Sequence, residues 1–199
     1  MFNFGVWNIR GLNTPDKQKE VQDLILSYKL SCIGLVETKI KHENLDSIFR
    51  RIIPRWSYLS NLALSYSCQI LVLWDTRLLN IFLQFDSSQL VDCLVQAVKV
   101  DLVFFISFVY GSNSVAEHRV LWEAMASRAS MDVDCPHVFL GDFNVVRYPE
   151  DRCRGCLDWL SSMEECNLGI VEANLDDLRS SGLRFSWRKG NLGVLRKLD

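Results

Sequence analysis

Apolar and polar residues follow two different periods along the chain, and the period changes from one segment to the next. Short apolar runs at 3–7 and 32–36 are typical of strands. Between them, a Thr-Pro pair at 14–15 is typical of a helix cap and first helical position, and apolar residues then recur at i, i+3, i+4 and i+7. The same spacing predicts a second helix over 45–52, which ends before Pro54.

The middle of the chain has a different character, because strand-like runs follow one another without helices. They lie at 56–64, 69–74, 78–85, 90–100 and 102–110. Helices are predicted again at 116–128 and 157–166, with a strand at 138–140 between them and a closing hairpin over 185–198. Consecutive strands argue against a simple alternating, all-parallel sheet and favour an α/β sandwich with mixed or antiparallel sheets. No internal repeat or Pro/Gly/Ser-rich linker interrupts the 199 residues, so we predict one domain over 1–199.

Composition excludes several classes of protein. The chain is 49% hydrophobic and 23% charged, with 10 Gly and 4 Pro, which is typical of a globular protein and not of a disordered or collagen-like one. A formal net charge of -2 argues against a protein that coats nucleic acid nonspecifically. No run of 18 apolar residues is present, so no membrane span is predicted, and the start lacks the features of a secretory signal. Seven cysteines without a framework spacing favour a reducing compartment, the cytosol or nucleus.

Polar side chains stand where predicted strands end. They are Asn8, Glu37, Tyr110, Asp142 with Asn144, and Asp199. Strand ends gathered at one edge of a sheet are where α/β folds build their sites. Carboxylate and amide oxygens are hard ligands that suit Mg²⁺ or Mn²⁺, and such a cation beside a carboxylate base is what phosphodiester hydrolysis requires.

Each of these residues also has a plainer interpretation. The segment 141–144 can be a simple turn, 8–11 can be ordinary loop, and Tyr110 can be a core residue with a solvated hydroxyl. A Cys-x-x-Cys pair at 153 and 156 resembles half of a zinc or redox site, but no second pair stands at a suitable spacing. The order of the strand-end residues along the chain is what favours a site.

That order resembles the endonuclease/exonuclease/phosphatase superfamily. More narrowly, it resembles the N-terminal endonuclease domain of plant LINE-type (non-LTR) retrotransposons. The matching segments are WNIRGLN at 7–13, VETK at 36–39, ILVLW at 70–74, VYGSN at 109–113, LGDFNVV at 140–146, FSW at 185–187 and LRKLD at 195–199. The resemblance spans essentially the whole chain and implies a deoxyribonuclease-like α/β sandwich of two mixed β-sheets flanked by helices.

The resemblance also implies roles for the strand-end residues. Glu37, helped by Asn8, would hold the divalent metal, Mg²⁺ or Mn²⁺. Asp142 would orient or deprotonate the attacking water, with Asn144 as its partner at the phosphate. Tyr110 would donate a hydrogen bond to the scissile phosphate.

Further roles fall on the last part of the chain and on Arg10. Asp199 matches an aspartate that in the family orients a catalytic histidine. Ser186 stands where the family often has threonine close to the DNA. Arg188 and Lys189 belong to a segment with several cations and no acid, and with Arg10 we expect them to contact DNA phosphates. The alternative for this basic segment is the solvated face of a hairpin.

One departure from the family pattern changes the expectation of activity. The family continues to a Ser-Asp-His motif whose histidine completes the site, and none of His42, His118 and His137 stands in such a motif. We therefore expect a chain truncated before that motif, with the last strands of one sheet missing and the fold incomplete at its C-terminal edge.

Three functions remain open at this point. The leading hypothesis is a metal-dependent phosphodiester hydrolase that nicks target DNA for retrotransposition. The alternatives are a truncated, catalytically inactive remnant that at most binds DNA or metal, and a phosphoesterase of the same fold with a small or lipid phosphate as substrate. The leading hypothesis implies DNA as partner, no membrane, a reverse transcriptase domain on the same chain in a full-length element, a monomer, and a nuclear or cytoplasmic location without secretion, the nucleus by resemblance alone.

Overall fold

The structure is a computed structural model that describes residues 1–64, 68–131, 134–153, 160–179, 181, 185–189 and 194–197. The chain divides into two compact units. The first unit comprises Met1–Tyr110 and Cys135–Asp142, and the second comprises Gly111–Asp134 and Phe143–Asp199. Among the described residues, no helix is both long enough and apolar enough to cross a membrane.

The first sheet of the first unit has four strands in the order β1-β2-β4-β3. These are β1 (Phe4–Asn8), β2 (Cys32–Ile40), β3 (Ser57–Ser60) and β4 (Cys68–Trp74). β1 and β2 run parallel, whereas β4 pairs antiparallel with both β2 and β3. The sheet is therefore mixed.

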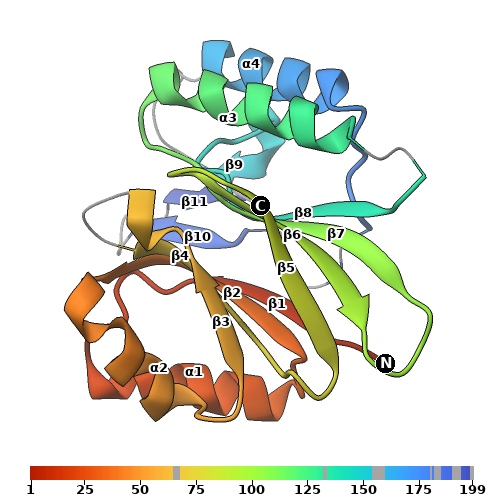
Figure 1. Ribbon diagram of the computed structural model, residues 1–199. Helices are drawn as coiled ribbons and strands as arrows, with labels where there is room; N and C mark the ends of the chain where they lie inside the picture. Colours follow the sequence, from red (N-terminus) through yellow and green to blue (C-terminus); the bar gives the residue numbers. More distant parts are fainter. Residues whose placement is uncertain are drawn as a thin grey trace. The chain divides into compact units, whose positions relative to one another are not determined.

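The second sheet of this unit also has four strands, in the order β5-β6-β7-β8 (Figure 1). They are β5 (Leu79–Asp86), β6 (Leu90–Ala97), β7 (Val103–Tyr110) and β8 (His137–Asp142). The first three form an antiparallel meander, and β8 joins β7 in parallel. The parallel addition of β8 requires a long crossover connection, which the chain supplies with residues 111–134 of the second unit.

Two helices cover one face of the first sheet, α1 (Pro15–Ser27) and α2 (Leu45–Ile52) (Figure 1). Thr14 caps α1, since its side chain accepts a hydrogen bond from the backbone N–H of Lys17. The short 3₁₀ helix η1 (His42–Asn44) leads directly into α2. Buried apolar side chains of both helices pack on the sheet to form the first core. The helices contribute Val21, Ile25, Ile48 and Ile52, and the strands contribute Leu35, Leu71 and Leu73.

A second core fills the space between the two sheets. Its members alternate in sequence with those of the first core, because successive strand residues point to opposite faces. They include Val36, Ile70, Val72, Val91, Val95, Ile106 and Phe108. Gly34 on β2 makes room for the Phe108 ring, since a Cβ at Gly34 would lie 2.1 Å from Phe108 Cδ1.

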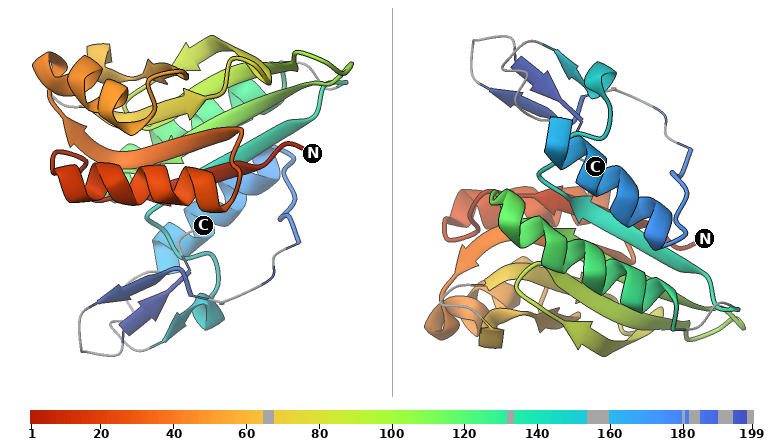
Figure 2. Two further views of the ribbon diagram at one scale, coloured as in Figure 1. Left: turned by 90° about the horizontal axis from the view of Figure 1, so that it is seen from below. Right: turned by 90° about the horizontal axis from the view of Figure 1, so that it is seen from above.

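The second unit contains α3 (Val115–Ala129) and α4 (Leu160–Glu172), which lie side by side in the view from above (Figure 2). Gly169 of α4 permits this contact, since a Cβ there would lie 2.8 Å from the side chain of Trp122 on α3. The unit also holds a small antiparallel sheet in the order β10-β11-β9. Its strands are β9 (Arg152–Cys153), β10 (Trp187–Lys189) and β11 (Val194–Arg196), and the 3₁₀ helix η3 (Pro149–Asp151) precedes them.

The fold class predicted from the sequence is confirmed: an α/β protein with two mixed β-sheets and flanking helices. Boundaries differ at several places, and the helix expected over 157–166 is α4, which continues to Glu172. The strand expected over 56–64 is the shorter β3 followed by the 3₁₀ helix η2 (Leu62–Leu64), because Asn61 turns inward and its amide donates to the carbonyls of Ser87 and Ser88. β2 continues past Glu37 as far as Ile40, and β9 was not expected.

Candidate active site

Asn8 and Asp142 end two strands of different sheets and meet in a hydrogen bond. Asn8 is the last residue of β1 and Asp142 the last of β8. The Asn8 Nδ2 atom donates to Asp142 Oδ2 at 2.8 Å, across 134 positions of sequence. The Asn8 Oδ1 atom accepts from the backbone N–H of Arg10 at 3.2 Å. These bonds fix the Asn8 side chain, and with it one oxygen of the Asp142 carboxylate.

Glu37 lies beside Asn8 because β1 and β2 are parallel and in register there. Asn8 is opposite Val36, and the N–H of Ile9 donates to the Val36 carbonyl. Immediately after Val36, the pairing of β2 with β4 is interrupted until Ile40. Glu37 occupies this bulge with φ of 56°, in the left-handed region. Bulges redirect side chains next to functional sites, and this one sets the direction of the Glu37 carboxylate.

The bulge is anchored on its far side by Thr38, which is fully buried. Its Oγ1 donates to the carbonyl of Cys68 on β4 at 2.7 Å. Burial raises the pKa of the Cys68 thiol to about 11, so this cysteine stays protonated.

The Glu37 side chain is 18% exposed, and its Oε1 lies 2.7 Å from the ammonium of Lys39.

Tyr110 ends β7 directly opposite Asp142 in the parallel pairing of β7 and β8. Its N–H donates to the carbonyl of Gln89, which fixes the backbone at that strand end. Gly141 precedes Asp142, and a Cβ there would lie 2.0 Å from the carbonyl oxygen of Val109. Backbone meets backbone at this point, so a side chain at 141 would push β8 away from β7 and displace Asp142.

Asn144 belongs to the second unit, where it links the two segments that follow β7 and β8. Its Nδ2 donates to the carbonyl of Gly111 at 2.7 Å, and its φ is 52°. A Cβ at Gly111 would lie 2.3 Å from the carbonyl oxygen of Phe143. The Phe143 ring stacks on Trp122 of α3, with the ring planes at 13°. These contacts hold the Asn144 segment in one arrangement.

The remaining predicted site residues are Arg10, whose backbone N–H donates to Asn8, three residues of the second unit, and Asp199. Arg10 is exposed, with φ of 52°. Ser186 is an exposed residue of the second unit, just before β10, and Arg188 and Lys189 are residues of β10 itself. Asp199 lies outside the described residues, as does Cys156 of the Cys-x-x-Cys pair.

The chemistry of Asn8, Glu37 and Asp142 fits a hard divalent cation. Two carboxylates and one amide supply only oxygen ligands, and Mg²⁺ typically takes one or two carboxylates and completes its shell with water and substrate phosphate. Among the described residues, no group of three or more His, Cys, Asp or Glu is placed to hold a metal. An all-protein cage of the zinc type is therefore not found in that part of the chain.

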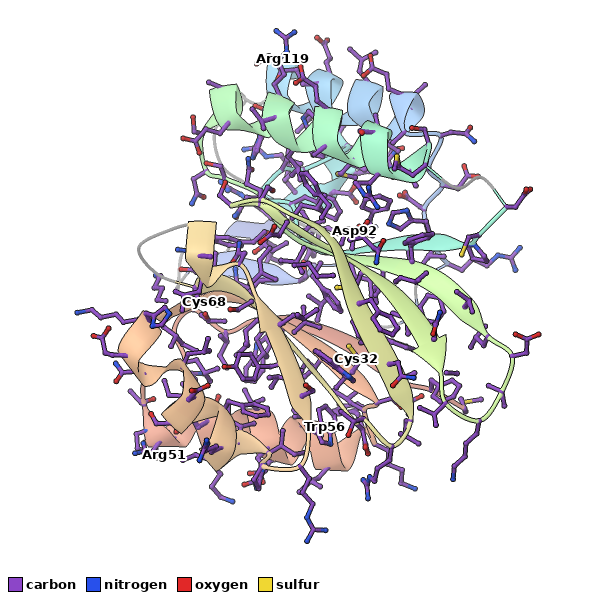
Figure 3. All side chains as sticks on the ribbon, in the orientation of Figure 1. Cys32, Arg51, Trp56, Cys68, Asp92 and Arg119 are labelled. Atoms are coloured by element: carbon purple, nitrogen blue, oxygen red, sulfur yellow. The ribbon has the colours of Figure 1, made fainter. Side chains whose placement is uncertain are left out.

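The sequence did not reveal a buried polar cluster on the second sheet, formed by Asp92, Ser107 and His137. Asp92, labelled on β6 in Figure 3, is fully buried. The Ser107 hydroxyl donates to Asp92 Oδ1 at 2.8 Å, and His137 Nε2 lies 2.9 Å from that hydroxyl and 3.1 Å from Asp92 Oδ1. Serine and aspartate both meet the same histidine nitrogen, which is not the relay of a hydrolytic triad. The cluster ties three strands together.

Comparisons with known proteins identify the fold. No protein-family model and no curated protein sequence matches the chain. Solved structures do match. The AP endonuclease LMAP from Leishmania major superposes with a TM-score of 0.65 at 12% identity, over 87% of this chain and 67% of that one.

Two further structures agree. An endonuclease/exonuclease/phosphatase family protein from Bacteroides thetaiotaomicron gives a TM-score of 0.55 at 10% identity, over 73% of this chain and 64% of that one. D. rerio TDP2, complexed with a single-strand DNA product, gives 0.52 at 14% identity, over 74% and 66%. The chain thus spans about two thirds of the length of these proteins. The similarity shows that the chain shares the fold of these proteins.

Proposed function

We propose that the chain is a metal-dependent phosphodiester hydrolase whose active site lies at the ends of β1, β7 and β8 and in the bulge of β2. The observation that carries the proposal is the hydrogen bond between Asn8 and Asp142 at 2.8 Å. It joins two strand ends, 134 positions apart in sequence, at the edge where the Glu37 bulge also lies. An amide and two carboxylates that the sequence placed at strand ends are the groups that a hydrolytic metal site requires.

The residues divide into two roles. Glu37 and Asn8 would hold Mg²⁺ or Mn²⁺, which when bound neutralises charge on the phosphate. Asp142 orients or deprotonates the attacking water, since its carboxylate is held by Asn8 and lies at the end of a strand. Tyr110, opposite Asp142, donates its phenol to a phosphate oxygen. Asn144 would assist Asp142 at the phosphate. Asp199 would orient a catalytic histidine.

The substrate that we propose is DNA, nicked as by a retrotransposon endonuclease. The support is the resemblance of the sequence segments described above, together with the DNA-processing relatives of similar fold. Ser186, Arg188, Lys189 and Arg10 would contact the DNA backbone, and a reverse transcriptase domain would belong to the same polypeptide in a full-length element.

Nicking of supercoiled plasmid in Mg²⁺ tests this proposal. We expect Glu37→Gln and Asp142→Asn each to lower the nicking rate by about 100-fold or more, since a catalytic unit loses orders of magnitude when one member is removed. Glu43→Gln is the matched control, because Glu43 is an exposed acid of η1, and its rate should equal that of the parent. Equal rates for the parent and both site variants would refute the assignment.

A second candidate function is a remnant that binds metal or DNA without cleaving it. The observation that favours it is the position of the three histidines of the chain, since the family pattern completes the site with a histidine. His137 is held in the cluster with Asp92, His118 contacts the carbonyl of Ser112, and His42 lies on η1. This candidate is supported if the folded chain binds Mn²⁺ through Glu37 and does not nick plasmid DNA.

A further inference from the structure

Resting on the proposed function, we propose that Lys39 is a built-in competitor of the divalent cation: its ammonium occupies the Glu37 carboxylate in the cation-free protein and lowers the affinity of the site. The observation is the ion pair between Lys39 Nζ and Glu37 Oε1 at 2.7 Å. The carboxylate is 18% exposed and the lysine side chain 55% exposed. The acid is thus mostly withdrawn from water, whereas the lysine retains room to leave.

The backbone, and not a chance meeting of two side chains, makes this pair. Glu37 and Lys39 both have left-handed φ, 56° and 54°. Such values are uncommon for residues other than glycine and persist only where the surroundings impose them. Thr38 between them turns to the opposite side and is buried against the Cys68 carbonyl. The side chains on either side of Thr38 are therefore presented together.

The loop after β1 holds the same three residues from the other side. The carbonyls of residues 37, 38 and 39 accept in turn from Gly11 N, Leu12 N and Asn13 Nδ2, at 2.8, 2.9 and 3.0 Å. Every backbone carbonyl of the bulge is thereby fixed. The loop that begins at Asn8, a proposed metal ligand, also sets the pair of Glu37 and Lys39.

The charges determine the consequence. A divalent cation at Glu37 must share or displace the ammonium already there, and it feels the repulsion of any cation that stays within a few ångströms. Because the lysine is half exposed, this repulsion is screened by water and is moderate. We expect removal of the Lys39 charge to tighten cation binding by about tenfold.

Direct Mn²⁺ binding, followed by electron paramagnetic resonance of the free ion, measures this without any turnover. The variants are Lys39→Met, the charge-retaining Lys39→Arg, and Lys41→Met as the matched control, since Lys41 is exposed and lies two residues beyond the pair. We expect tighter binding in Lys39→Met alone, with Lys39→Arg and Lys41→Met close to the parent. Lys39→Gln replaces Lys39→Met if the methionine variant fails to fold by circular dichroism.

A Glu37→Gln background separates the lysine from the site. If Lys39 acts on the carboxylate, its removal should change Mn²⁺ affinity less when Glu37 is already neutral. Unchanged or weaker binding in Lys39→Met overturns the inference and leaves the proposed function standing. Equal affinity of the parent and Glu37→Gln overturns the proposed metal ligand itself, and no binding by either the parent or Lys39→Met overturns both.

Discussion

At the scale of single residues, the distance to neighbouring atoms determines which substitutions a glycine position tolerates. Gly34 faces the ring of Phe108, and Gly141 faces a backbone carbonyl. At Gly34 the neighbour is a side chain on another sheet, which a compensating change can shorten. At Gly141 the neighbour is Val109 backbone, which nothing short of moving the strand relieves. The two glycines therefore differ in whether a second substitution can rescue the first.

Gly34→Ala should lower the free energy of unfolding by about 2 kcal/mol, because a Cβ 2.1 Å from Phe108 Cδ1 overpacks the core between the sheets. Urea unfolding measures it. Phe108→Leu in the same chain should recover part of the loss. Gly5→Ala is the control, since its Cβ would lie 3.1 Å from the flexible end of Leu30, and its loss should be smaller. Equal losses at Gly34 and Gly5 would contradict the packing argument.

Tyr58 supplies a prediction at alkaline pH. Its hydroxyl donates to Asp46 at 2.5 Å, and this bond raises the pKa of Tyr58 to about 12. Because the folded pKa lies above that of the unfolded chain, the contribution to stability is present below pH 10 and is lost as pH rises toward 12. Asp46→Asn should bring the pKa of Tyr58 back toward 10, measured by phenolate absorbance. An unchanged titration curve would exclude Asp46 as the cause.

At the scale of elements, the sequence predicted the regular parts well and the irregular parts poorly. Thr14 and Pro15 placed the start of α1 correctly, since capping is a local interaction. The bulge after Val36 was not expected, because periodicity does not show that Glu37 and Lys39 adopt left-handed φ. The sequence predicted that β2 ends at Glu37, whereas in the structure β2 continues to Ile40.

The candidate site was predicted to the same degree and for the same reason. Strand-end positions indicated that Asn8 and Asp142 would approach each other, and they do. The sequence did not predict the cluster of Asp92, Ser107 and His137, because its members come from three different strands. In sequence, Asp92 has the pattern of an ordinary outward-facing polar residue between buried Val91 and Cys93. Only the assembled sheet shows that it is buried.

This cluster predicts how β6, β7 and β8 depend on one another. His137→Ala removes a partner from the buried Asp92 carboxylate and should destabilise the protein by about 3 kcal/mol in urea unfolding. The double variant Asp92→Leu, His137→Leu removes the buried charge as well and should lose less than His137→Ala alone. A larger loss in the double variant would show that the cluster stabilises by more than pairing.

At the scale of the whole molecule, the second sheet ends at β5, which no described strand covers on its outer side. The strand exposes Phe82, Leu83 and Phe85, with 47%, 43% and 36% of their surface accessible. Exposed apolar edge strands invite pairing between molecules. A register shift between Leu83 and Phe85 interrupts the β5–β6 pairing, and such a bulge limits pairing along the edge.

Leu83→Lys should therefore reduce self-association at high concentration, measured by light scattering, while the thermal unfolding midpoint stays close to that of the parent. Leu168→Lys is the comparison, because Leu168 is an exposed leucine of α4 and a helix offers no strand edge. An equal reduction in both variants would mean that surface apolarity in general, and not the edge, causes association.

The hydrogen bond between Asn8 and Asp142 has a consequence in time. It joins the first strand of the chain to a residue 134 positions later, and β8 is the last strand of the second sheet in sequence order. Contacts so far apart in sequence form late, since the closure of the intervening chain must come first. The first hundred residues contain β1 to β6, but neither β7 nor β8. The contact between Asn8 and Asp142, on which the proposed site rests, therefore cannot form before β8 is in place.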